Sequence, residues 1–130
     1  ARGDLEEALR IRREEELPVY ERLGDVRSRA VTMGQIADVL QARGDLEEAL
    51  RIRREEELPV YERLGDVRSL LVGQANLALT HLARGQEGDR ETAKTLLHAA
   101  FQAAASMGLP EAQQILTILD SRNLPPPPHA

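Results

Sequence analysis

The sequence contains no cysteine, and aromatic residues make up only 2% of its 130 residues. The absence of cysteine excludes disulfide bonds, thiolate metal sites and a cysteine nucleophile. The shortage of aromatic side chains means that a core must be built from Leu, Ile, Val and Ala. No apolar run approaches the ~20 residues that a membrane-spanning helix needs, and no secretory signal is visible. We therefore expect a cytoplasmic protein that does not enter a membrane.

Positive charge is also in short supply, because 17 Lys and Arg residues stand against 22 Asp and Glu residues, for a net charge of -5. Domains that bind nucleic acid carry a basic patch, so this balance disfavours a nucleic-acid partner. Nearly every Arg has acidic neighbours in the sequence. That pattern favours solvated helix faces with many ion pairs.

What the sequence does contain is a literal repeat. The segment ARGDLEEALRIRREEELPVYERLGDVRS occupies residues 1–28 and recurs without change at residues 42–69, an offset of 41. A diverged copy begins with ARG at residue 83. Identity over 28 residues indicates tandem duplication rather than a shared helical propensity. It predicts one supersecondary unit stacked on its like.

Each unit has the pattern of two helices. Gly44 is placed to end the first helix, and Asp45 with Glu48 three residues later is an acidic relative of the capping box, repeated at Asp4 and Glu7. Apolar residues recur at spacings of three and four between these signals. The pattern predicts six helices joined by short Gly-containing turns, at residues 5–23, 26–42, 46–64, 67–82, 90–107 and 110–121.

The helices group into a repeat array of residues 1–123. We expect an unpaired second-type helix at residues 1–24, a full repeat at 25–65, a diverged repeat at 66–108 and a capping helix at 109–123. Because the pattern starts midway through a unit, we expect this chain to be a fragment of a larger protein. The proline-rich tail, residues 124–130, cannot form a helix, and we favour a disordered segment over an SH3-type ligand.

Several positions of the unit resemble the tetratricopeptide repeat. The family's small residue, turn glycine and second-helix alanine fall on Ala37, Gly44 and Ala49, with Ile36 and Leu40 among the matching apolar positions. The period of 41 exceeds the family's usual length of about 34, as in long-helix relatives such as kinesin light chain. The resemblance implies an all-α fold, a right-handed α-solenoid of antiparallel helix pairs. It also implies that the two helices of a unit approach closely at Ala37 and Ala49.

In this family the first helices of the pairs line a groove that holds a peptide or a partner helix. The resemblance places a partner groove at Val31, Gly34, Asp38, Gln41, Val72, Ala75, Leu79 and Leu82. The second half of this set is apolar, so it either grips a hydrophobic partner or is covered by the C-terminal helices. Family members that bind chaperone C-termini clamp carboxylates with Lys, Arg and Asn. Only Asn76 resembles such a residue here, which disfavours that ligand class.

A charged pair stands inside the apolar stripe of the second-type helices. Arg53 and Glu57 are spaced i,i+4, and Arg12 and Glu16 are their copy. The pair is either partly desolvated, setting the register between units, or an ordinary solvated pair, which we favour. Pro residues at positions 18 and 59 follow these pairs and are expected to kink or break the helices.

No residue pattern points to catalysis or to a metal. The Arg-Gly-Asp tripeptides at residues 2–4 and 43–45 match the integrin-recognition sequence, but a glycine turn followed by a helix-capping Asp explains them. His81, His98 and His129 have no partner at ligand spacing on one helix face. No phosphate loop or nucleophile elbow is present. We therefore expect no enzyme and no cofactor.

The leading prediction is a protein–protein interaction module that belongs to a larger scaffold or sensor and binds a peptide or a partner protein. The alternative is a structural repeat whose main role is homo-oligomerisation. The first helix lacks a preceding partner, so we expect its apolar stripe to face water and to form a homodimer. The predicted self-association face comprises Leu5, Ala8, Leu9, Val19, Tyr20 and Leu23.

Overall fold

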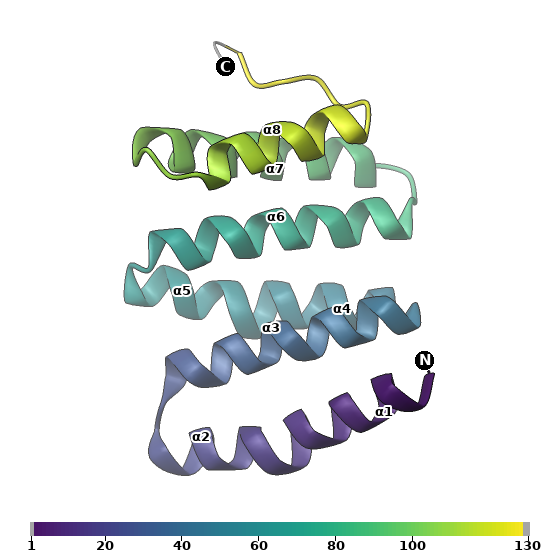
Figure 1. The fold of residues 1–130 in the computed structure, drawn as a ribbon, viewed down its shortest axis with the longest axis vertical. Helices are drawn as coiled ribbons and strands as arrows, with labels where there is room; N and C mark the ends of the chain where they lie inside the picture. The colour runs from purple at the N-terminus through teal and green to yellow at the C-terminus, as the bar shows by residue number, and fades with distance from the viewer. Residues whose placement is uncertain (1, 129–130) are drawn as a thin grey trace. The chain divides into compact units, whose positions relative to one another are not determined.

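The computed structural model describes residues 2–128, with the side chain of Arg2 excepted. These residues form six helical segments and no strand (Figure 1). The first is α1 (Arg2–Arg10), the π-helical turn η1 (Ile11–Glu16) and α2 (Leu17–Leu23), and the third is α4 (Leu46–Ile52), η2 (Arg53–Glu57) and α5 (Leu58–Leu64). The others are α3 (Val26–Arg43), α6 (Val67–Arg84), α7 (Asp89–Ser106) and α8 (Glu111–Ser121). The all-α prediction is confirmed, and every predicted helix end lies within about three residues of the observed one.

The contacts divide the chain into two compact units, which meet in sequence at Gly65 and Asp66. The first unit holds α1 to α5, and the second holds α6 to α8. In the first unit α3 runs antiparallel to the helical segments before and after it (Figure 1). Within the described residues no helix is both long and apolar enough to cross a bilayer.

The turns of the first unit follow from glycine and aspartate. Gly24 and Gly44 adopt left-handed φ angles of 67° and 89°, which end α2 and α3 at little steric cost. The Asp25 side chain then accepts a hydrogen bond of 3.0 Å from the Ser28 N–H, capping α3. The predicted capping box at Asp45 is wrong, because its side chain makes no capping bond and instead pairs with Arg43 at 2.9 Å.

Each proline follows a π-helical turn. Pro59 has no N–H and its ring crowds the carbonyl four residues earlier, so α-helical hydrogen bonding cannot continue through it. The chain responds with η2, where the Leu58 N–H bonds to the Arg53 carbonyl five residues back. The same bond joins Leu17 to Arg12 in η1. The predicted break does not occur, because the helix continues into α2 and α5 after one wider turn.

The core of the first unit joins all three of its helical segments. Leu9, the α3 residues Met33, Ile36, Ala37 and Leu40, and the α4 residues Ala49 and Ile52 form one buried cluster. Both alanines that the resemblance places at a close helix approach are fully buried in it. Their burial in a cluster shared by α3 and α4 is what a close approach of these two helices requires.

The second unit has its own core, made by α6, α7 and α8. Leu71, Ala78, Leu97 and Leu119 are among its buried members, and Leu124 joins them from beyond α8. The Arg90 guanidinium donates to the Asn123 carbonyl at 2.6 Å, and the His98 ring lies 2.8 Å from the Pro125 carbonyl. The first part of the predicted disordered tail therefore lacks regular structure but packs on this core. Residues 129 and 130 lie outside the described residues.

Candidate protein-interaction surface

A charged pair lies in the interior of the first unit. Arg53 and Glu57, at the two ends of η2, are 1% and 6% exposed. The Arg53 Nη1 lies 3.7 Å from the Glu57 Oε1, and the Tyr61 hydroxyl donates to the other carboxylate oxygen at 3.4 Å. Burial of a charged pair requires further polar partners. The solvated interpretation that the spacing favoured is therefore wrong for this copy.

Three residues of α3 supply the surroundings of this pair. Asp38 accepts a hydrogen bond of 2.7 Å from the Arg53 Nη2, and the Gln41 side-chain oxygen lies 3.3 Å from the same nitrogen. Gly34 faces Glu57, and a Cβ at this position would overlap with the carboxylate. Because the three residues are spaced by four and three, they share one face of α3. That face of α3 leaves room for the Glu57 carboxylate and offers two acceptors to the Arg53 guanidinium.

The electrostatic environment of Glu57 is dominated by desolvation. Burial raises the pKa of this carboxyl above its ordinary value, and the nearby Arg53 guanidinium offsets only part of that effect. Burial therefore favours the protonated form of this carboxyl, and the attraction to Arg53 opposes it.

The first copy of the repeat has the same sequence but a different environment. The Arg12 Nη1 lies 3.2 Å from Glu16 and donates to the side-chain oxygen of Gln35 on α3 at 2.9 Å. The side chains of this pair are 29% and 33% exposed, against 2% and 8% for the pair in the second copy. Arg12 Nε is shielded from solvent and has no acceptor within the described residues.

Four residues of the first copy form what we term the open face: Ala8, Ile11, Arg12 and Glu16. Their repeat equivalents are Ala49, Ile52, Arg53 and Glu57, which are 0%, 2%, 1% and 6% exposed. The same four positions are only half-buried in the first copy. In the second copy α3 contacts these positions through Gly34, Asp38 and Gln41. In the first copy α3 makes contact through Leu9, the Glu6–Arg43 pair and Gln35, which accepts a hydrogen bond from Arg12. These contacts leave the four residues of the open face half-buried.

The predicted self-association face divides into covered and exposed residues. Leu9 is 3% exposed and belongs to the core, so the expectation that it faces water is wrong. The reason is that the following helix, α3, covers this side of the first copy. Val19 and Leu23 are 38% and 71% exposed. Leu5, Ala8 and Tyr20 are half-buried.

The predicted partner groove is taken up in part by internal packing. In the first unit Gly34, Asp38 and Gln41 face the buried pair. Val31 lines a hollow of about 420 Å³ together with Arg12 and other residues of η1, α2 and α3.

The groove residues predicted on α6 also differ in exposure. Ala75 lies in the core of the second unit and Leu82 packs against it, which favours the covered alternative for these two. Val72 is 38% exposed, and Leu79 is half-buried.

A second buried charged cluster, not anticipated from the sequence, lies at the start of α7. Asp89 is 2% exposed and accepts hydrogen bonds from the Arg84 guanidinium, the His81 ring and the Gln86 N–H, at 2.7 to 2.9 Å. The arginine and histidine hold the pKa of this carboxyl well below its usual range. The cluster joins α6 to α7 across the turn at residues 85–88. An Asp after a Gly-rich turn is a helix-start signal that could have indicated it.

The second tripeptide, residues 43–45, lies at the turn between α3 and α4. Gly44 ends α3, as the structural interpretation requires, but Asp45 precedes the first residue of α4 without a side-chain capping bond. Arg43 is engaged with Asp45 and, at 3.1 Å, with Glu6. In the described part of the chain no group of three or more acidic or histidine side chains is arranged to hold a metal ion.

Comparison with known proteins yields no further assignment: no family model, no curated protein and no solved structure matches this chain.

Proposed function

We propose that this chain is a protein–protein interaction module, a repeat scaffold of the tetratricopeptide type that binds a peptide or a partner protein as part of a larger scaffold or sensor. Its helix pairs would follow the right-handed superhelical path of that family. The literal repeat supports this proposal, because tandem copies of one helical segment are typical of stacked repeat arrays.

The observation that carries the proposal is the unequal burial of two identical segments. Four positions that are nearly inaccessible in the second copy remain half-buried in the first. A surface that is buried in one copy and half-buried in the other favours association with a further helix. Exposed apolar residues at Val19 and Leu23 extend the accessible area.

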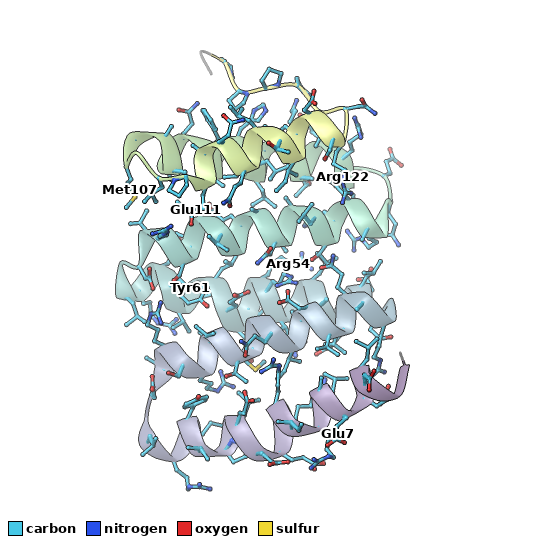
Figure 2. All side chains as sticks on the ribbon, in the orientation of Figure 1. Glu7, Arg54, Tyr61, Met107, Glu111 and Arg122 are labelled. Atoms are coloured by element: carbon cyan, nitrogen blue, oxygen red, sulfur yellow. The ribbon has the colours of Figure 1, made fainter. Side chains whose placement is uncertain are left out.

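Co-purification from cells of the source organism tests this function. A partner should accompany the parent chain in a fixed molar ratio and be lost when Ile11→Glu or Val19→Glu is introduced. Met107→Glu is a matched control, because Met107 is 49% exposed but lies in the second unit (Figure 2). Equal recovery with all variants, or no stoichiometric partner with the parent chain, would count against the proposal.

Self-assembly is the second candidate, favoured by the exposure of Leu23 at the end of α2. Each apolar side chain transferred from water to an interface contributes ~1.5–3 kcal/mol when fully buried. Sedimentation equilibrium at tens of micromolar should then detect a two-fold dimer that Leu23→Glu converts to monomer. A parent chain that is monomeric over this range would eliminate this candidate.

A further inference from the structure

The second repeat copy contains a complete example of how the buried charged pair is covered. Arg53 and Glu57 are enclosed by α3 through a small residue, a carboxylate and a side-chain amide. These are Gly34, Asp38 and Gln41, so the covering helix carries the pattern Gly-x-x-x-Asp-x-x-Gln. Gly34 leaves space for the Glu57 carboxylate, and Asp38 forms an ion pair with the Arg53 guanidinium. Gln41 offers that guanidinium a further acceptor.

The first copy presents the same chemical groups in the same helical frame. Its sequence is identical, and its π-helical turn begins one residue before Arg12 and ends at Glu16. The open face therefore carries the same groups that contact α3 in the second copy. In the described chain α3 contacts this copy through Leu9 and through the hydrogen bond from Arg12 to Gln35, while its Gly34, Asp38 and Gln41 face the second copy.

We infer that the open face (Ala8, Ile11, Arg12 and Glu16) is a docking site for an α3-type helix of another repeat, recognised through the Gly-x-x-x-Asp-x-x-Gln pattern. The inference rests on the proposed interaction function and specifies its partner chemistry. A folded second copy of this chain does not suit the site, because its own Gly34, Asp38 and Gln41 already enclose its Arg53–Glu57 pair. The helix that binds must carry the Gly-x-x-x-Asp-x-x-Gln pattern without an Arg–Glu pair of its own already in contact with it.

Recognition by this site requires both charge and shape. Asp in the incoming helix would accept hydrogen bonds from Arg12, which in the second copy corresponds to the 2.7 Å contact of Arg53 with Asp38. The absence of a side chain at the Gly position would admit the Glu16 carboxylate. The apolar residues of the open face, Ala8 and Ile11, would be buried as Ala49 and Ile52 are.

A terminally blocked peptide with the sequence of residues 26–43 is the direct probe. Added to the isotope-labelled full chain, it should shift the backbone amide resonances of Ala8 to Glu16 and leave those of α7 unchanged. Asp38→Ala in the peptide should weaken binding about tenfold, the effect of one lost charge-assisted hydrogen bond. Arg12→Ala in the chain should do the same. Arg10→Ala is the matched control, because Arg10 pairs with Glu7 on the exposed surface and should leave affinity unchanged.

A tethered version removes the dependence on peptide helicity. Residues 26–41 are placed directly before Ala1, which reproduces the spacing found in residues 26–69. The thermal midpoint should rise, and replacing the added copy of Asp38 by Ala should abolish most of the gain. No rise in the midpoint would overturn the inference. Peptide binding that ignores both Arg12 and Asp38 would also overturn it while leaving the proposed function intact, whereas failure of the function appears separately as the absence of any stoichiometric partner in cells.

Discussion

Gly34 shows how a single residue can be explained by a contact far away in the sequence. A glycine in the middle of a helix ordinarily costs about 0.5–1 kcal/mol relative to alanine. Here the missing side chain makes room for the Glu57 carboxylate. The loss of helix propensity at Gly34 is therefore explained by the space that the Arg53–Glu57 pair requires beside α3.

The first prediction follows from this contact. Gly34→Ala should destabilise the chain by about 1 kcal/mol, since displacement of the Glu57 carboxylate outweighs the gain in helix propensity. In a Glu57→Ala background the same change should become stabilising. Gly3→Ala is the control, because nothing lies within 4 Å of a Cβ at position 3. Urea denaturation of the four variants measures the coupling, and additive effects of the two changes would show that the residues do not interact.

A second prediction concerns the pH dependence of the buried pair. Because burial raises the pKa of Glu57 above 4.5, the folded chain holds this proton more tightly than the unfolded chain does. The contribution of Glu57 to stability is therefore greatest at low pH and declines as the pH rises through 4.5 and beyond. Glu57→Gln should remove this decline, so the stability difference shifts in favour of the variant between pH 4 and pH 7.

Glu16→Gln provides the matched control for this pH series, because Glu16 holds the same repeat position with its side chain 33% exposed. Its stability difference from the parent should change less with pH. Denaturant midpoints at each pH measure both variants. If Glu57→Gln loses stability relative to the parent as the pH rises, attraction to Arg53 outweighs desolvation and the assigned direction is wrong.

At the scale of elements, the helix ends were predictable because each is marked by a local signal. Glycines in the left-handed conformation end α2, α3, α5 and α6, and short-range geometry alone accounts for them. Which aspartate caps its helix could not be predicted from the sequence in the same way. Asp25 caps α3 whereas Asp45 pairs with Arg43, a competition between neighbouring side chains that spacing does not reveal.

The π-helical turns illustrate a further limit. Proline at positions 18 and 59 predicts a disturbance, since its ring excludes the regular hydrogen bond. A proline by itself does not determine whether a helix breaks, bends or widens by one residue. The same widened turn forms in both copies, although Arg53 and Glu57 are buried and their equivalents are only half-buried. The form of the disturbance therefore follows from the segment that the two copies share and not from the packing of either copy.

The third prediction tests the junction between α6 and α7. Hydrogen bonds from Arg84 and His81 hold the pKa of Asp89 well below its usual value of 3.8, so its contribution to stability is present above that value and is lost as the pH falls through the lower folded-state value. Asp89→Asn should therefore lower the thermal midpoint at pH 7, and its difference from the parent should narrow in acid. Asp120→Asn, on the exposed surface of α8, should have little effect at either pH. A difference that stays constant down to pH 2 would rule out this ionic origin.

For the molecule as a whole, the repeat limits what any local rule can predict. Arg12 and Arg53 have identical neighbours for eleven residues before them and sixteen after them, yet their side chains are 29% and 2% exposed. A prediction made from the shared 28-residue segment alone gives both copies the same environment. The all-α fold and the six helices could be read from pattern, whereas the buried pair and the open face depend on which side of each copy α3 occupies.

The last prediction uses this internal comparison to test whether the two copies differ in the way described. Ala49 is fully buried between α3 and α4, while Ala8, its exact sequence equivalent, lies half-buried on the open face. Ala49→Leu should overpack the core and cost ~1–3 kcal/mol of unfolding free energy. Ala8→Leu should change it by less than about 0.5 kcal/mol, as is usual for surface substitutions. Because the flanking sequences are the same, differences in helix propensity cancel between the two variants. Chemical denaturation of both variants decides the matter: equal losses would mean that the open face is packed as tightly as its buried counterpart, and the docking surface would lose its basis.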